Sequence, residues 1–272
     1  MRIHIQHDTV YSYDEPVTYS IQALRLRPLD TASQRILNWN VEVPAFASLR
    51  DQRDAYGNVL QMLYVERPHT EILLRVSGEA ETSETHGVVA TAGEKFPPRF
   101  YLRRTILTEP DQAVTELAAA AIKASDGTPL DLAHCLMHKT RDALDYMIGE
   151  TDVTTTAAQA LENGSGVCQD HAHVFVSAAR LAGLPARYVS GYLLAEADGQ
   201  GDAAHAWAEA YIEDLGWVGF DVANRICPTE AHLRVASGLD YLEAAPIRGL
   251  RRGGGQETLD VRVRVAETAA QQ

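Results

Sequence analysis

Cys168 is the residue whose type and setting most clearly suit chemistry. It follows a glycine-containing run at residues 164–167 and stands in the first turn of a predicted helix over residues 167–182. Unpaired N–H groups at a helix start favour the thiolate, which is the nucleophilic form of cysteine. The glycines let backbone approach a substrate closely, and the Cys168 N–H can point at a developing oxyanion. These features predict a nucleophile for acyl transfer, although a buried structural cysteine can also stand at a helix start.

The other two cysteines lack this setting. Cys135 lies on the apolar stripe of a helix that Thr128-Pro129 opens, and we expect it to fill the core. Cys227 stands beside Pro228 after a strand and has no assigned task. The odd count and wide spacing exclude a disulfide scaffold and a CxxC metal or redox site.

His205 is the candidate general base, because a nucleophilic cysteine needs a base within hydrogen-bond reach. It lies on a predicted strand over residues 204–212, on the face that also carries Trp207. Asp221 belongs to the next predicted strand, over residues 217–222, and would orient the imidazole and stabilise its cation. The alternatives are a histidine bonded to backbone and a strand-end aspartate that caps a turn.

The spacing of these two strands does not settle the contact between the base and the carboxylate. A hairpin whose turn is centred on Leu215 places Asp221 opposite Glu209. Contact between Asp221 and His205 then requires a longer loop or an offset pairing, so the spacing alone leaves the pair open.

Histidine pairs raise the alternative of a metal site. His171 and His173, and likewise His134 and His138 on a helix, each supply two ligands. Zinc needs three or four ligands, and no third one stands at a telling spacing. We therefore predict no metal, and acyl transfer by a thiol needs no organic cofactor.

The chain divides into a β-rich first part and a mixed second part. Alternation over residues 37–43 and the turn signal at Gly57-Asn58 predict short strands, as in a β-sandwich. Predicted helices and three further strands follow. We predict an α+β fold with an N-terminal β-sandwich-like domain over residues 1–105 and a catalytic core over residues 106–272. Its last strand, over residues 259–265, could return to either sheet.

Four segments resemble the core of the bacterial transglutaminase-like superfamily: residues 166–173 (GVCQDHAH), 180–192 (RLAGLPARYVSGY), 205–209 (HAWAE) and 216–221 (GWVGFD). The resemblance implies a papain-like fold, with helices packed on an antiparallel sheet, and a catalytic triad of Cys168, His205 and Asp221. Residues 1–100 resemble, more loosely, the β-rich N-terminal region that often precedes this core. Proteins of this superfamily are commonly described as cysteine proteases or transglutaminase-like enzymes.

The sequence departs from the family pattern at two places. His171 stands where the family usually has Phe, and Val222-Ala223 replaces Pro-Thr before Asn224. Neither change removes a member of the implied triad. We expect Asp170 and Asn224 to give structural support to the site.

A second oxyanion donor is expected from an aromatic side chain. Papain-like enzymes use a glutamine a few residues before the cysteine, whereas transglutaminase-like enzymes place an aromatic N–H or O–H upstream. Tyr146 is the upstream candidate, and Trp207 is a further candidate for oxyanion or substrate binding.

Composition limits the classes of partner. The chain has 272 residues and a net charge of −13. Such an acidic balance argues against nucleic acid and anionic membrane, because both need Lys and Arg to meet phosphate. No apolar run approaches the roughly 18–20 residues of a transmembrane helix, and residues 1–10 lack a signal-peptide core. We therefore expect a cytoplasmic protein.

These observations predict a hydrolase, either a cysteine protease or an amidase, that acts on a protein or peptide substrate. Transamidation of protein glutamine is the alternative reaction. A different alternative is a non-catalytic binding module whose β-rich N-terminal domain docks a protein partner. An arylamine acetyltransferase is disfavoured, because the sequence shows no basic phosphate-binding loop for an acyl-thioester donor.

Overall fold

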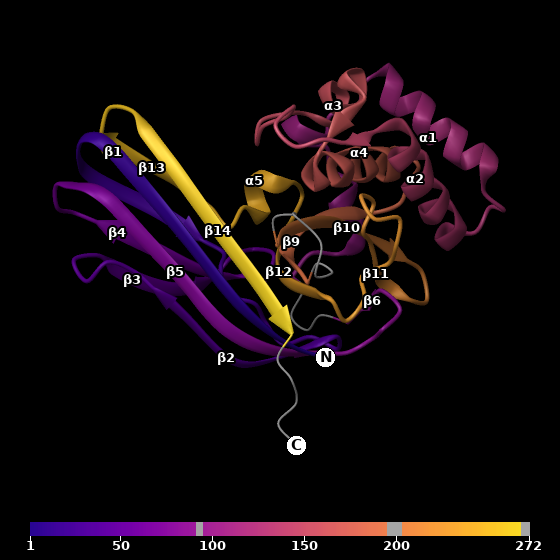
Figure 1. Ribbon diagram of the computed structural model, residues 1–272. Coiled ribbons are helices and arrows are strands. Elements are labelled where there is room, and N and C mark those ends of the chain that lie inside the picture. Colours follow the sequence, from indigo (N-terminus) through magenta and orange to yellow (C-terminus); the bar gives the residue numbers. More distant parts are fainter. Residues whose placement is uncertain (91–94, 195–202, 268–272) are drawn as a thin grey trace.

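The computed structural model describes residues 1–90, 95–194 and 203–267. Most of its strands form two large antiparallel sheets, and helices gather over the second sheet (Figure 1). The α+β class predicted from the sequence is confirmed. Among the described residues, no helix is long and apolar enough to cross a membrane.

The first sheet is built around one long strand, β1 (Arg2–Leu24). Its other strands are β2 (Gln34–Glu42), β3 (Ser48–Arg53), β4 (Val59–Val65), β5 (His69–Thr82), β13 (Ile247–Gly253) and β14 (Glu257–Glu267). The first half of β1 pairs with β5 and β14, and the second half pairs with β4 and β13. Strand β2 pairs with β5 and β3 pairs with β4, whereas β13 and β14 pair with β1 alone.

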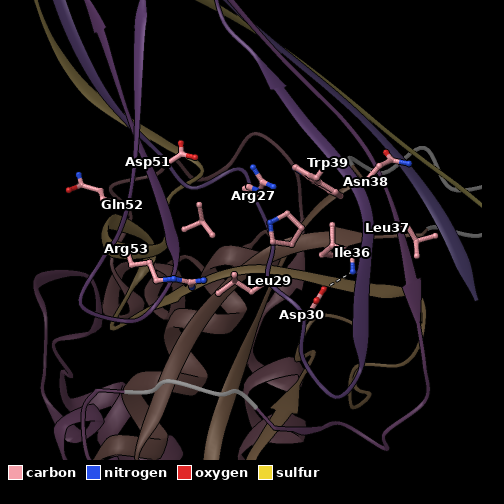
Figure 2. A pocket seen from close by; sticks show the side chains of 12 residues that line it. Arg27, Leu29, Asp30, Ile36, Leu37, Asn38, Trp39, Asp51, Gln52 and Arg53 are labelled. Atoms are coloured by element: carbon pink, nitrogen blue, oxygen red, sulfur yellow. Dashed lines mark hydrogen bonds between the residues drawn. The ribbon is translucent and has the colours of Figure 1, made fainter.

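One pocket of the first sheet, of about 630 Å³, is lined by residues of both β2 and β3, including Trp39, Asp51 and Arg53 (Figure 2). Buried apolar side chains such as Leu63 and Ile72 form the core of this sheet. The predicted β-rich N-terminal domain is confirmed, and no candidate catalytic residue lines its pocket.

The second sheet carries the candidate site. Its strands, in spatial order, are β12 (His232–Gly238), β9 (Ala186–Leu193), β10 (Ala204–Ile212), β11 (Gly216–Phe220) and β6 (Val88–Val89). The short elements η1 (Pro98–Leu102), η2 (Ile106–Thr108) and α5 (Tyr241–Ala244) lie near it. The longer helices are α1 (Gln112–Ala124), α2 (Pro129–Ala143), α3 (Ala157–Asn163) and α4 (Cys168–Leu181). The Thr128 cap predicted for α2 is confirmed.

Helix α4 is buried along most of its length, and its packing fixes where Cys168 lies. The helix packs against β10, and Phe175 stacks on Phe220 of β11 with 5.2 Å between ring centroids. Small side chains on β10, Ala208 and Ala210, belong to the same buried cluster and let the helix lie close to the sheet. Helix α4 is therefore held against β10, which carries His205, and against Phe220 of β11, which Asp221 follows directly.

The last two strands return to the first sheet. Residues 247–253 and 257–267 pair with β1, although the division made from the sequence gave them to the catalytic core. Of the two sheets left open for the strand over residues 259–265, the first is the one that it joins. The domain boundaries themselves stay a prediction.

Candidate active site

The loop before α4 is fixed by the carboxylate of Asp170. Its Oδ2 atom accepts hydrogen bonds from the Val167 N–H at 2.8 Å and from the Thr151 hydroxyl at 2.7 Å. A side chain at Gly166 would meet Asp170 atoms at 2.6 Å, so the close approach requires glycine. Cys168 follows as the first residue of α4 and is half-buried.

His205 lies between Cys168 and Asp221. Its Nε2–H donates to Asp221 Oδ2 at 2.8 Å, and the Cys168 thiol hydrogen-bonds the same imidazole. Nδ1 is the ring nitrogen that this arrangement leaves for the sulfur. Burial alone lowers the His205 pKa, but the hydrogen bonds and charges of Asp221 and Cys168 outweigh it and raise the pKa to about 10. The site therefore favours an imidazolium next to the thiol.

The hairpin between β10 and β11 brings the imidazole and the carboxylate together. Its turn is centred on Asp214, which has a left-handed φ of 70°, and Ala208 pairs with Phe220. The register predicted from a turn centred on Leu215 is therefore wrong by one residue at the turn. Continued past β11, the observed register places Asp221 opposite Trp207 and diagonal to His205, which is within side-chain reach.

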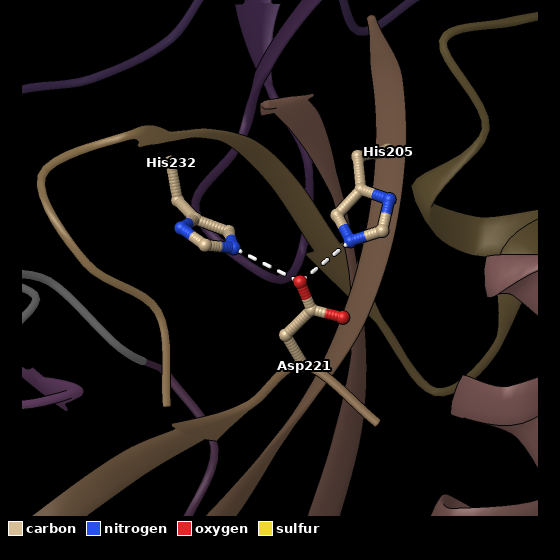
Figure 3. A group of neighbouring side chains, drawn as sticks. All are labelled: His205, Asp221 and His232. Carbon is tan, nitrogen blue, oxygen red and sulfur yellow. Dashed lines mark hydrogen bonds and ion pairs between the residues drawn. The ribbon is translucent and has the colours of Figure 1, made fainter. Parts of the chain in front are cut away.

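The Asp221 carboxylate accepts hydrogen bonds from three side chains at a single oxygen. His205, His232 and Asn224 donate to Oδ2 at 2.8, 3.0 and 2.7 Å (Figure 3). The Asn224 backbone N–H also donates to Oδ1, at 3.3 Å. Burial would raise the Asp221 pKa, but the donors His205 and His232 and the positive charge of His205 hold that pKa well below its usual range. The carboxylate is therefore kept ionised although it is buried.

His171 and His173 serve α4 and its contacts. The two ring nitrogens of His171 lie 2.9 Å from the Val167 carbonyl and 3.3 Å from the Leu144 carbonyl. His173 Nε2 accepts the Tyr241 N–H at 3.1 Å. Burial lowers both pKa values, that of His173 to about 3. The departure from Phe at residue 171 thus places a buried, backbone-bonded imidazole beside the candidate nucleophile.

Tyr146 lies near the loop that precedes Cys168. It belongs to β7 (Asp145–Tyr146), which pairs in parallel with β8 (Ser165–Gly166). The Tyr146 side chain is 45% exposed, and its ring lies 6.0 Å from that of His171. A role as oxyanion donor stays a prediction.

Trp207 is buried beneath the two histidines. Its ring meets that of His232 edge-on, with 5.5 Å between centroids, and lies 6.3 Å from that of His205. A side chain at Gly191 of β9 would come within 2.6 Å of the indole, so the missing side chain makes room for the ring. Trp207 thus packs against the rings of both histidines, and its role in oxyanion or substrate binding stays a prediction.

His232 is the site residue that the sequence analysis did not single out. It begins β12, which pairs with β9 on the side away from β10. Among the described residues, His205, Asp221 and His232 form one group whose possible metal-ligating atoms lie within 4.8 Å of one another. Hydrogen bonds to Asp221 account for this group without an ion, and the absence of a metal stays a prediction.

Comparison with known families agrees with the fold. Residues 117–222 match the transglutaminase-like superfamily, and residues 3–81 match the bacterial transglutaminase-like N-terminal region. A Mycobacterium leprae protein is 32% identical, over 98% of this chain and 99% of its own length. The chain therefore belongs to the transglutaminase-like superfamily and carries its bacterial N-terminal region, as the sequence resemblance predicted.

Two further proteins are similar to this chain. A protein-glutamine gamma-glutamyltransferase of Pseudomonas aeruginosa is 32% identical over 33% of this chain and 15% of that protein. A crystal structure from Cytophaga hutchinsonii, provisionally described as a cysteine protease, covers all of this chain and 92% of its own with a TM-score of 0.77 and 19% identity. The chain thus has the fold of transglutaminase-like enzymes.

Proposed function

We propose that this protein is a thiol-dependent acyl-transfer enzyme with a triad of Cys168, His205 and Asp221. The observation that carries the proposal is the position of the His205 imidazole, which hydrogen-bonds the Cys168 thiol on one side and Asp221 on the other. A structural cysteine has no need of such a partner. The raised pKa of His205 supports the same assignment, because an imidazolium stabilises a neighbouring thiolate.

Each member of the triad has a defined step. His205 takes the proton of Cys168, and the thiolate attacks the carbonyl carbon of a peptide or amide bond. The Cys168 N–H, with Tyr146 as a second candidate donor, stabilises the tetrahedral oxyanion. The imidazolium then protonates the leaving amine, and a thioester between the acyl group and Cys168 remains. Asp221 stabilises the cationic form of His205 throughout.

Hydrolysis of the thioester is our first proposal for the second half of the reaction. Cys168 is half-buried rather than enclosed, so water can reach an acyl group bound to it. Transfer to an amine requires a site that excludes water. Transamidation remains the second candidate, because the matched Pseudomonas aeruginosa relative is a protein-glutamine gamma-glutamyltransferase.

Alkylation of the three cysteines tests the nucleophile. At neutral pH, we expect iodoacetamide to modify Cys168 faster than Cys135 or Cys227, as followed by mass spectrometry of peptides. The other two thiols are internal controls, because burial raises the pKa of both, and Asp131 raises that of Cys135 further. Equal rates at the three residues would contradict the assignment.

Turnover separates the remaining alternatives. The purified protein is incubated with a peptide library, with and without a primary amine, and the products are identified by mass spectrometry. Hydrolysed peptides support a protease or amidase, whereas incorporation of the amine supports a transglutaminase. Cys168→Ala should abolish turnover and keep partner binding, whereas a binding module would show no turnover to lose.

A further inference from the structure

His232 lies at the start of β12, and its imidazole reaches the carboxylate that also holds His205. Its Nε2 atom lies 3.0 Å from Asp221 Oδ2, and its side chain is 2% exposed. Figure 3 shows the two imidazoles converging on one oxygen. The mechanism proposed above leaves this second histidine without a task.

The backbone determines which nitrogen of His232 carries the proton. The Thr229 N–H donates to His232 Nδ1 at 3.1 Å, so Nδ1 must offer its lone pair. A neutral imidazole then carries its proton on Nε2, which donates to Asp221. A second proton, on Nδ1, would face the Thr229 N–H. The turn that holds Thr229 is closed by the His232 N–H, which donates to the Thr229 carbonyl at 3.0 Å.

We infer that His232 is a positioning residue that acts through Asp221, as a neutral donor that directs the carboxylate toward His205. The inference rests on the proposed function, because it assigns His232 to the same triad. A neutral donor holds the oxygen in place and leaves its negative charge available to the His205 imidazolium. A lysine or arginine at this place would neutralise the carboxylate and weaken that interaction.

The surroundings of His232 fit a fixed neutral ring. Trp207 packs edge-on against it, with an interplanar angle of 85°. The charged groups that line the small cavity beside it are Glu209 and Arg234, and these pair with one another at 2.8 Å. The nearest cation on β12 is therefore engaged by Glu209 rather than by Asp221. Asn224, the third donor to Oδ2, is also neutral.

A metal ion is a poorer occupant of this group. A ligating His232 Nε2 would need a free lone pair, but the Thr229 contact places the proton on that nitrogen. Asn224 also donates an N–H to the oxygen that would face the ion. Hydrogen bonds to Asp221 Oδ2 explain the positions of His205, His232 and Asn224 together.

Two variants of His232 separate positioning from simple loss of structure. His232→Gln keeps an N–H donor near the place of Nε2, whereas His232→Leu removes it. At about pH 6, we expect His232→Leu to slow alkylation of Cys168 about 10- to 100-fold and His232→Gln to restore most of the rate. At about pH 9.5, where an ordinary thiol ionises without help, the variants should approach the wild-type rate. His69→Leu, which removes a buried histidine of the first sheet, is the matched control and should leave both rates unchanged.

A double-mutant cycle tests whether His232 acts through Asp221. If it does, His232→Leu adds no further loss when Asp221 is already Asn. Imidazole ¹⁵N NMR should also show the ring proton of His232 on Nε2, the nitrogen that faces Asp221. The inference is overturned if the losses in alkylation rate of the two single variants multiply in the double variant, or if His232→Gln reacts no faster than His232→Leu. A proton on Nδ1 of His232 would overturn it as well. None of these outcomes would affect the proposed triad. A wild-type Cys168 no more reactive than Cys135 would instead refute the proposed function, and the role of His232 with it.

Discussion

The two sheets of this protein place their charged side chains differently. In the first sheet, ion pairs that bridge neighbouring strands lie at the surface, as in Arg75–Asp8 and Arg35–Glu81. In the second sheet, Glu209 is fully buried and pairs with both Arg187 and Arg234. Asp221 is also fully buried there and is held by two histidines.

This difference shows that the buried charged side chains belong to the second sheet. A buried ion costs desolvation free energy unless partners and hydrogen bonds offset that cost, whereas an exposed pair costs and contributes little. Strands β9, β10 and β12 carry the Arg187, Glu209 and Arg234 network, and the Asp221 group lies beside it. The second sheet thus keeps ionised groups at defined places in its interior, which is what general acid–base chemistry requires.

Removal of the Asp221 charge should have the largest effect. Asp221→Asn keeps the shape of the side chain but takes away the anion that stabilises the His205 imidazolium. The His205 pKa should fall from about 10, since burial alone lowers it, and Cys168 loses its cationic partner at neutral pH. We expect turnover to fall about a thousandfold to ten-thousandfold, as measured by kcat/KM on a peptide found in the library screen.

Asp260→Asn is the control for that variant. Asp260 forms an exposed pair with Arg262 on β14, so the same substitution leaves the interior unchanged. Turnover of Asp221→Asn equal to that of the control would remove Asp221 from the proposed triad.

The buried network of Glu209 should carry the next largest effect, on stability. Glu209→Gln removes the buried anion that pairs with Arg187 and Arg234, which we expect to cost about 3–5 kcal/mol in the free energy of unfolding. Burial alone raises the Glu209 pKa, but the two arginines lower it below its ordinary value. The stability from Glu209 is therefore present above the unfolded pKa of about 4.3 and is lost as pH falls below it. Urea unfolding of the wild type and of Glu209→Gln at neutral and acidic pH measures this loss of stability and its pH dependence. A difference between the two proteins that does not shrink in acid contradicts the ion-pair explanation.

Buried histidines sharpen the comparison, because one lies in the first sheet and another in helix α4, which packs on the second sheet. Burial lowers the pKa of His7 on β1 to about 4 and that of His173 on α4 to about 3. Each therefore stabilises the fold above the unfolded pKa of about 6.5, and this stability is lost as pH falls toward the folded pKa. At about pH 5, each histidine should therefore lower the free energy of unfolding by about 2 kcal/mol relative to pH 7, because one pKa unit corresponds to about 1.4 kcal/mol.

His7→Gln and His173→Gln should each reduce this acid sensitivity by a similar amount, as measured by urea unfolding at both pH values. Similar changes for the two variants would limit the difference between the two parts of the molecule to charged pairs. If only His173→Gln reduced the sensitivity, buried titratable groups in general would distinguish the second sheet.

Elements specified by neighbouring residues could be predicted from the sequence. The predicted strand over residues 204–212 has the same bounds as β10, and Thr128 caps α2 as expected. Caps, turns and alternating patterns depend on side chains within a few residues of one another. The same holds for the setting of Cys168 at a helix start after glycines.

Contacts between distant segments could not be predicted in the same way. The left-handed backbone of Asp214 moves the hairpin centre by one residue, and that shift takes Asp221 from Glu209 to Trp207. His232 reaches the site on β12, which follows β11 in the sequence but pairs with β9 on the side away from β10. Register and strand order depend on tertiary packing, which no local pattern records.

The smallest expected effect comes from repeating the Glu209 substitution on the first sheet. Glu81→Gln breaks the pair with Arg35, whose side chains are 44% and 67% exposed. Water solvates the arginine that remains, so we expect a change below about 0.5 kcal/mol in the free energy of unfolding. The residue type, the substitution and the arginine partner match those of Glu209→Gln, and burial is the main difference. Only the Glu209 pair lies in the interior. Similar losses in the free energy of unfolding for the two variants would therefore show that burial does not explain the difference between the sheets.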